Sequence, residues 1–233
     1  MTGTLRLACM DSDAPPLFGL ARPDGSRHGY EPAAAGLVAA ELGVSVQWVI
    51  LPWVDMIPAV QQGRADAVWC GQGITPERAA QVDFTTPYAI FDEAVLVPRG
   101  SGRTDAAALR GLRVAAIAAS ANLALAKTFD GAVPVPFDGA SDDVFGDMVQ
   151  ALRRGEVDAV VDDDVVLAPF DDDPELEVGF TVATRNRWGV GVAKERPDLR
   201  DRISAALDAV IANGRLEEVW RTWIPRLAFP LAP

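Results

Sequence analysis

Short apolar runs alternate along the chain with longer segments whose apolar residues recur every three or four positions. The short runs predict buried strands, and the periodic segments predict amphipathic helices. We expect strands over residues 5–10, 44–51, 94–97, 113–117, 133–135, 157–161 and 187–194. We expect helices over residues 32–42, 53–62, 120–129, 141–152, 199–213 and 216–223. This alternation predicts an α/β fold with mainly parallel sheets covered by helices.

The helix ends carry recognisable signals. Pro32 stands at the start of one predicted helix and Gly43 follows its end, as is common at these two positions. Ser141, Asp142 and Asp143 precede another predicted helix, where they are expected to cap its first turn.

The stretch Asp66–Arg78 predicts a strand, a glycine-rich turn and a short helix. Gly71 and Gly73 break the apolar run, Thr75 suits a helix N-cap, and the proline after it suits the first helical position. Backbone N–H groups and the Arg78 guanidinium then lie close together, a combination suited to an anion such as a carboxylate. The alternative is an ordinary strand–helix connection with Arg78 on a solvated helix face.

Two features predict two lobes. The strand–turn–helix pattern of residues 66–78 recurs at 114–125, as if an α/β unit restarted. The strand at 188–192, punctuated by two glycines, would return the chain to the first lobe.

Composition narrows the function. With 233 residues, 49% hydrophobic and 23% charged, the chain can bury a substantial core. The net charge of −12 argues against a nucleic-acid partner, and no stretch is apolar enough to span a membrane. Cys9 and Cys70 do not have the spacing of a metal site, although they can form one disulfide. His28 is the only histidine, which argues against a histidine zinc site or a Ser-His-Asp triad.

The chain begins without a recognisable signal peptide, because residues 5–10 are too short for its apolar region. We therefore expect either a cytoplasmic protein or one whose secretion signal was trimmed.

Several segments together resemble the bacterial extracellular solute-binding family 3, the periplasmic receptors of amino-acid ABC importers. The segments are Gly29–Glu31, Trp53, Ile57–Val60, Gly63–Ala67, Ile74–Arg78, Val82–Tyr88, Leu109–Val114 and Gly155–Val161. The resemblance implies a two-lobed periplasmic-binding-protein-like α/β fold of type II, with a ligand cleft between lobes joined by two crossover strands. Lobe 1 is expected to comprise residues 1–94 and 192–233, and lobe 2 residues 95–191.

The resemblance also implies an amino-acid site. Arg78 would pair with the ligand α-carboxylate, Ser120 would add its hydroxyl and a backbone N–H, and Asp163 would accept from the α-ammonium group. A buried zwitterion needs both charges matched. Ser120 as a simple helix cap and Asp163 as part of a solvated acidic loop are the alternatives.

Further residues complete the implied site. Backbone groups of Gly71 and Gly73 would join the grip on the carboxylate, and Trp53 would pack on the ligand side chain unless it belongs to the core. Gly73 stands where a Ser or Thr is common in the family. Pro15 stands where an aromatic often covers the ligand, which leaves Phe18 or Trp69 as substitutes.

Two more residues are candidates for ligand contact. Asp11 would favour a cationic ligand side chain. Cys70 adjoins Gly71 and is expected to be a small buried residue rather than a nucleophile, because His28 lies far away in sequence.

The expected function is capture of a free amino acid and its delivery to an ABC permease by a monomer, without cofactor or metal. Its expected location is periplasmic, or extracellular and associated with the membrane, and the sequence leaves open whether a lipid anchor preceded Met1. One alternative is an enzyme resembling cyclohexadienyl or arogenate dehydratases, with an acid from Asp162–Asp164 as general acid. Another is the sensor domain of a signalling receptor.

Overall fold

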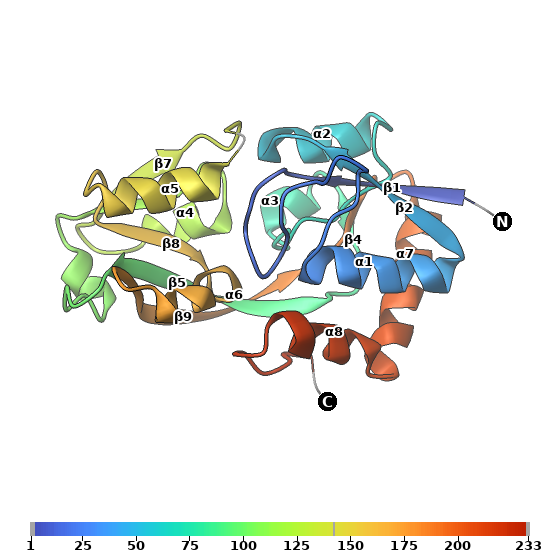
Figure 1. Ribbon diagram of the computed structural model, residues 1–233. Coiled ribbons are helices and arrows are strands. Elements are labelled where there is room, and N and C mark those ends of the chain that lie inside the picture. The colour runs from blue at the N-terminus through green and yellow to red at the C-terminus, as the bar shows by residue number, and fades with distance from the viewer. Residues whose placement is uncertain (1–2, 142, 232–233) are drawn as a thin grey trace. The chain divides into compact units, whose positions relative to one another are not determined.

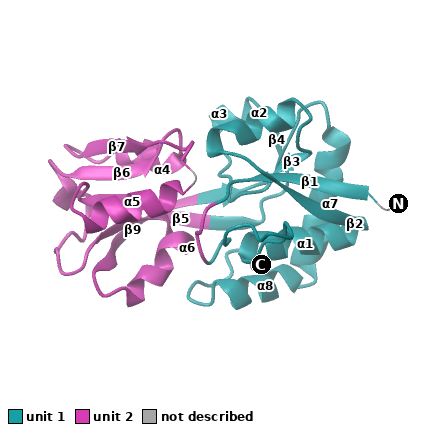
Figure 2. Cartoon of the chain, turned by 45° about the horizontal axis from the view of Figure 1, so that its top comes forward, with its two compact units in different colours: residues 1–11, 16–90, 186–233 teal, residues 12–15, 91–185 magenta. Residues whose placement is uncertain are grey.

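The computed structural model describes residues 3–141 and 143–231. The chain divides into two compact units, each with its own five-stranded sheet (Figure 2). Unit 1 comprises residues 1–11, 16–90 and 186–233, and unit 2 comprises residues 12–15 and 91–185. The lobe limits expected at residues 94 and 191 stay predictions.

The sheet of unit 1 has the strand order β2-β1-β3-β10-β4. Figure 1 labels three of its strands, β1, β2 and β4. Its strands are β1 Gly3–Cys9, β2 Val44–Ile50, β3 Ala67–Val68, β4 Asp83–Phe84 and β10 Gly191–Val192. Strand β1 pairs in parallel with β2 and β3, so the carboxyl ends of these three strands share one edge. Strand β10 runs antiparallel to β3 and β4. Leu7 and Ala8 in β1 are fully buried, as expected for a strand covered on both faces.

Helices cover both faces of this sheet. They are α1 Tyr30–Leu42, α2 Met56–Gln61, α3 Pro76–Ala79, α7 Pro197–Ala212 and α8 Arg215–Trp223, with a 3₁₀ turn at Trp53–Asp55. Helix α1 packs on β2, α7 and α8, whereas α2 packs on β1 and β3. Figure 2 shows α2 and α3 on one side of the sheet and α1 and α8 on the other. Gly43 ends α1 in a left-handed conformation with φ of 66°, which confirms the predicted stop signal.

The sheet of unit 2 has the order β7-β6-β8-β5-β9. Its strands are β5 Ala89–Pro98, β6 Arg113–Ile117, β7 Val133–Phe137, β8 Ala159–Asp163 and β9 Leu176–Trp188. Strand β6 pairs in parallel with β7 and β8, and β5 runs antiparallel to β8. The first residues of β5 and the last residues of β9 belong to unit 1, so the chain passes between the units within these strands.

The helices of unit 2 pack on this sheet and enclose an aliphatic core. They are α4 Ala121–Ala126, α5 Val144–Arg153 and α6 Asp164–Leu167, with 3₁₀ turns at Ala106–Leu109 and Ala168–Asp172. Val95, Val114 and Val161, from three neighbouring strands, belong to the core. Asp143 caps α5 by accepting the Gly146 N–H at 3.2 Å, which confirms this part of the predicted cap. Asp142 lies outside the described residues.

Two expectations from the sequence were wrong in detail. The sheets are mixed rather than mainly parallel, because β5 and β10 run against their neighbours. The strand predicted at 187–194 is the end of β9 followed by the separate strand β10. Strand β9 begins at Leu176, well before the predicted start. Exposed polar residues interrupt its apolar ones, so it contains no continuous apolar run of the kind used to predict the strands.

None of the helices in the described ranges has both the length and the apolar character needed to cross a membrane.

Candidate functional site

In unit 1, the connection from β3 to α3 has the predicted strand–turn–helix form. Gly71 adopts φ of 56°, a left-handed conformation that glycine reaches without steric cost. Thr75 caps α3 by accepting the Arg78 N–H at 3.3 Å. Gly73 pairs with Trp188 in an isolated antiparallel bridge, which anchors the turn on the end of β9.

Arg78 is buried, with 9% of its surface exposed. Its Nη1 donates to the Gly73 carbonyl at 2.8 Å, and its guanidinium carbon lies 5.2 Å from the centre of the half-buried Trp53 ring. A carbonyl and an aromatic face therefore orient the guanidinium plane. This burial contradicts the alternative in which Arg78 is a solvated surface charge.

The same turn is fixed by a buried carboxylate at the start of α1. Glu31 is fully buried, and its Oε2 accepts from the Gly71 N–H and the Tyr88 hydroxyl, both at 2.9 Å. The Gly71 N–H, which was expected to face the ligand, is thus bonded within unit 1. Burial raises the pKa of Glu31 to about 7, against the lowering effects of the Gly71 N–H, the Tyr88 hydroxyl and the charge of Arg27.

Other polar atoms near the turn have no hydrogen-bond partner among the residues that the structure describes. They are Glu31 Oε1, Trp69 Nε1 and Gln72 Oε1, all buried. Trp69 is fully enclosed, with its ring centre 5.2 Å from that of Tyr88, so it belongs to the core of unit 1. Most buried polar atoms in proteins are paired, so this turn has unused hydrogen-bonding capacity.

The remaining unit 1 candidates have partners of their own. Asp11 accepts the Ala21 N–H at 2.8 Å and lies 3.7 Å from the buried guanidinium of Arg27. The same guanidinium lies 4.9 Å from the centre of the buried Phe18 ring. Cys70 is buried, and its Sγ lies 3.1 Å from the Sγ of Cys9. Contact of Asp11, Phe18 or Cys70 with a ligand stays a prediction.

Unit 2 repeats the strand–turn–helix arrangement between β6 and α4. Ser120 is the N-cap of α4: its Oγ accepts the Leu123 N–H at 3.0 Å and donates to the Ile117 carbonyl at 2.6 Å. The preceding Ala119 has φ of 59°, a left-handed conformation that costs a residue with a Cβ atom free energy. Backbone strain of this kind, directly before the N-cap of a helix, is a feature of functional turns.

Carboxyl groups crowd the end of β8 in unit 2. Glu93 of β5 stands opposite Asp163 in the ladder and is buried with 1% exposure. Asp162 is also buried and accepts from Asn122 Nδ2 at 3.2 Å and from the Asp163 N–H at 2.8 Å. The Thr184 hydroxyl donates to Glu93. Asp163 ends a core strand, which contradicts the alternative of a solvated acidic loop.

This crowding changes the protonation of the carboxyl groups. Burial raises the pKa of Asp162 to about 7 and that of Asp164 to about 6. The pKa of Asp163 is raised well above its usual value, first by burial and then by the charges of Asp162 and Glu93. A cation would relieve this repulsion, so the end of β8 is suited to bind one.

Glu31, Glu93 and Asn122 were not identified from the sequence as site residues. The sequence feature that could have identified them is an ionisable or amide side chain inside an otherwise apolar strand or in the first turn of a helix. Among residues 3–141 and 143–231, no group of three or more His, Cys, Asp and Glu side chains is arranged to hold a metal ion.

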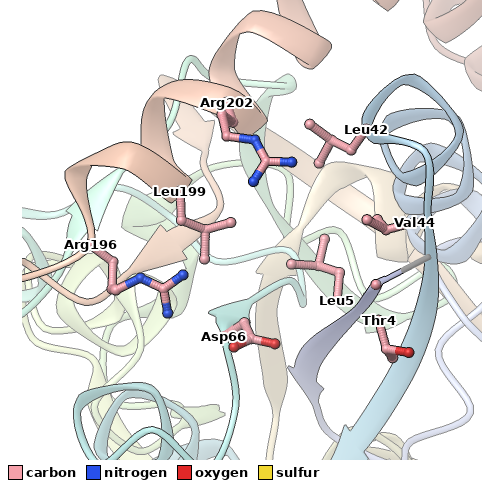
Figure 3. Close-up of a pocket in the computed structure, with 9 residues that line it drawn as sticks. Thr4, Leu5, Leu42, Val44, Asp66, Arg196, Leu199 and Arg202 are labelled. Carbon is pink, nitrogen blue, oxygen red and sulfur yellow. The ribbon is translucent and has the colours of Figure 1, made fainter. Parts of the chain in front are cut away.

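Unit 1 also contains a pocket away from these turns, with a volume of about 220 Å³ (Figure 3). It is lined by Leu5, Leu42, Val44 and Leu199, with Asp66 and two arginines, Arg196 and Arg202, at its sides. Its strand residues come from the amino ends of β1 and β2, whereas the turn that carries Arg78 follows the carboxyl end of β3. None of the predicted ligand-binding residues lines this pocket.

Comparison with known proteins gives matches over most of the chain. The sequence profile of the bacterial extracellular solute-binding proteins, family 3, matches residues 7–226. The L-arginine-binding protein of Pseudomonas aeruginosa is 28% identical over 216 residues, which cover 88% of this chain and 82% of the relative.

Solved structures agree with the sequence comparison. An ancestral arginine-binding protein bound to arginine superposes with a TM-score of 0.84 at 29% identity, covering 96% of this chain and 99% of that chain. An ancestral amino acid-binding protein described as a precursor of cyclohexadienyl dehydratase gives 0.83 at 26% identity, covering 95% and 96%. The predicted two-lobed α/β fold class is confirmed.

The raised pKa of Glu31 predicts a pH-dependent contribution to stability. In the unfolded chain this group titrates near 4.5, so the folded state holds its proton more tightly. The contribution is therefore fully present below pH 4.5 and is lost as the pH rises through 7, by up to about 3 kcal/mol. We expect Glu31→Gln to flatten this part of the profile of thermal denaturation temperature against pH.

Glu195→Gln provides the matched control, because Glu195 is exposed and belongs to the same unit. Asp162 and Asp164 make the same pH-dependent contribution to stability in the wild type, Glu31→Gln and Glu195→Gln. Their contribution therefore cancels when the profiles of the variants are compared with that of the wild type. A Glu31→Gln profile parallel to that of the wild type between pH 4.5 and 7 would contradict the assignment.

Proposed function

Because the chain belongs to the bacterial extracellular solute-binding proteins of family 3, we propose that it binds a free amino acid, or a close analogue, and delivers it to an ABC import permease. The family predicted from the sequence is confirmed by the match over residues 7–226. In this proposal the protein acts as a monomeric receptor outside the cytoplasm, at the membrane that holds the permease.

The observation that carries the proposal is the buried, oriented guanidinium of Arg78. The Gly73 carbonyl and the Trp53 ring fix its plane, and a planar guanidinium binds a carboxylate through two parallel hydrogen bonds. In the proposal Arg78 holds the α-carboxylate, and Trp53 also contacts the ligand. In the proposal, the Ser120 hydroxyl and backbone N–H, at the start of α4, turn from the Ile117 carbonyl to the ligand carboxylate.

The acidic end of β8 supports the second half of the proposal. Asp163 accepts from the α-ammonium group, and the buried carboxyls of Asp162 and Glu93 strengthen the negative potential there. A ligand with both charges then satisfies Arg78 and Asp163 together, which favours the state of the protein in which both residues reach it.

Replacement of Arg78 tests the carboxylate contact. We expect isothermal titration of the common amino acids to find at least one that binds the wild type. Arg78→Ala is then expected to weaken that binding by about 30-fold or more, because removal of one partner of a buried charge pair costs roughly 2–5 kcal/mol. Arg78→Lys is expected to restore part of the affinity, because it keeps the charge but not the bidentate geometry.

Arg221→Ala is the control, since Arg221 belongs to the same unit and its side chain is 71% exposed. Binding of no amino acid by the wild type would refute the proposed function. Unchanged affinity in Arg78→Ala would refute the role of Arg78 alone.

Asp163 generates a second prediction, based on proton linkage. Binding of an ammonium group lowers the pKa of the nearby carboxyls, which are raised in the free protein. Ligand binding near pH 7 is therefore expected to release protons, and affinity is expected to rise as the pH increases from 6 toward 8. Calorimetry in two buffers of different ionisation enthalpy measures the protons released.

We expect Asp163→Asn to weaken binding by about 10- to 100-fold and to reduce the proton release. The exposed Asp130, also in unit 2, provides the matched Asp130→Asn control. Proton uptake on binding by the wild type would contradict the assignment of Asp163 to the ammonium group.

The raised carboxyl pKa values also favour a second function, general-acid catalysis, because a dehydratase needs a protonated acid near neutral pH. We propose binding without turnover, since the carboxyl groups sit where a ligand cation is expected. Incubation of the purified protein with prephenate or arogenate, followed by chromatography, should show no conversion above a protein-free control. Conversion that Asp162→Asn or Asp164→Asn abolishes would establish the enzyme.

A further inference from the structure

The two cysteines of the chain lie side by side in unit 1. Cys9 ends β1, and Cys70 follows shortly after β3, the parallel neighbour of β1. Their sulfur atoms are 3.1 Å apart, although the residues are 61 positions apart in sequence. Both are free thiols, with exposures of 1% and 3%.

The surrounding backbone holds the two residues in this arrangement. The ladder pairs Ala8 with Val68, and the Met10 N–H donates to Cys70 Sγ at 3.4 Å. A disulfide has a sulfur–sulfur bond of about 2.05 Å, so closure needs an approach of roughly 1 Å. Side-chain rotation supplies a movement of this size without a change in strand pairing.

We propose that Cys9 and Cys70 are a disulfide-forming pair, oxidised as the chain folds outside the cytoplasm. The family is extracellular, and disulfides persist in oxidising compartments. The bond would tie the end of β1 to the residue before Gly71, at the turn that leads to Arg78. This inference does not rest on the identity or the binding of a ligand.

The reaction is thiol–disulfide exchange with an external disulfide, either a small molecule or an oxidoreductase. The thiolate of one cysteine attacks the oxidant, forms a mixed disulfide and releases one oxidant thiolate. The thiolate of the second cysteine then attacks the sulfur of the first and releases the other. Two electrons and the two thiol protons pass to the oxidant, which becomes two thiols if it is a small molecule and a dithiol if it is an oxidoreductase.

The timing of oxidation follows from burial. In the folded protein neither thiol is open to a large reagent, and burial beside Cys9 raises the pKa of the Cys70 thiol well above its usual value. Little of the Cys70 thiol is therefore present as thiolate once folding is complete. Oxidation is expected during folding, when the thiols are accessible, and the completed bond is shielded from reductants afterwards.

The test is refolding of the denatured, reduced full-length chain in oxidised and reduced glutathione, followed by alkylation in denaturant and mass spectrometry. We expect a product two hydrogen masses lighter than the dithiol and without alkyl groups. Digestion should give one linked peptide pair that contains Cys9 and Cys70. Two alkylated cysteines in the refolded protein would overturn the proposal.

Thermal denaturation provides a second readout. The oxidised wild type is expected to melt roughly 5–15 °C above the same chain refolded with a reductant, because the bond closes a long loop of the unfolded chain. The double variant Cys9→Ser, Cys70→Ser is the control and should melt at one temperature in both conditions. Equal melting temperatures for oxidised and reduced wild type would overturn a stabilising role for the bond.

Discussion

The buried carboxylate of Glu31 is the interaction on which the candidate site of unit 1 depends. It stands at the start of α1 and accepts hydrogen bonds from the Gly71 N–H and the Tyr88 hydroxyl. One side chain thus joins a helix, the turn after β3 and the segment before β5. Arg78 lies only a few residues after this turn. Its position therefore depends on the same Glu31 hydrogen bonds.

The two units share one local backbone structure in different electrostatic surroundings. In each, a strand leads through a left-handed residue to a helix with a hydroxyl N-cap: Gly71 and Thr75 in unit 1, Ala119 and Ser120 in unit 2. The surroundings then differ in charge. The turn of unit 1 adjoins the guanidinium of Arg78, whereas strand β8 of unit 2 ends in buried carboxyl groups.

Local signals allowed much of the fold to be predicted. Thr75 caps the start of α3 and Gly43 ends α1. Each makes its capping contacts with residues a few positions away, so both caps can be predicted from the local sequence. Family resemblance pointed to Arg78 and Asp163, but their burial and partners depend on contacts between distant segments. Glu93 illustrates the limit, because its place opposite Asp163 depends on the β5–β8 register, which no local pattern encodes. Most of the long strand β9 escaped prediction for a related reason, since its partner strand β5 is distant in sequence and polar residues interrupt its apolar ones.

The position of β10 has a consequence for the order in which the chain folds. This strand lies between β3 and β4 in the sheet of unit 1, although it is translated about a hundred residues after them. Unit 2 ends at residue 185 and can fold before the C-terminal helices are in place. The N-terminal part of unit 1 cannot complete its sheet until β10 is available, because β10 is an interior strand of that sheet. Its nascent edges are therefore exposed longest, and early encounters with chaperones should fall there.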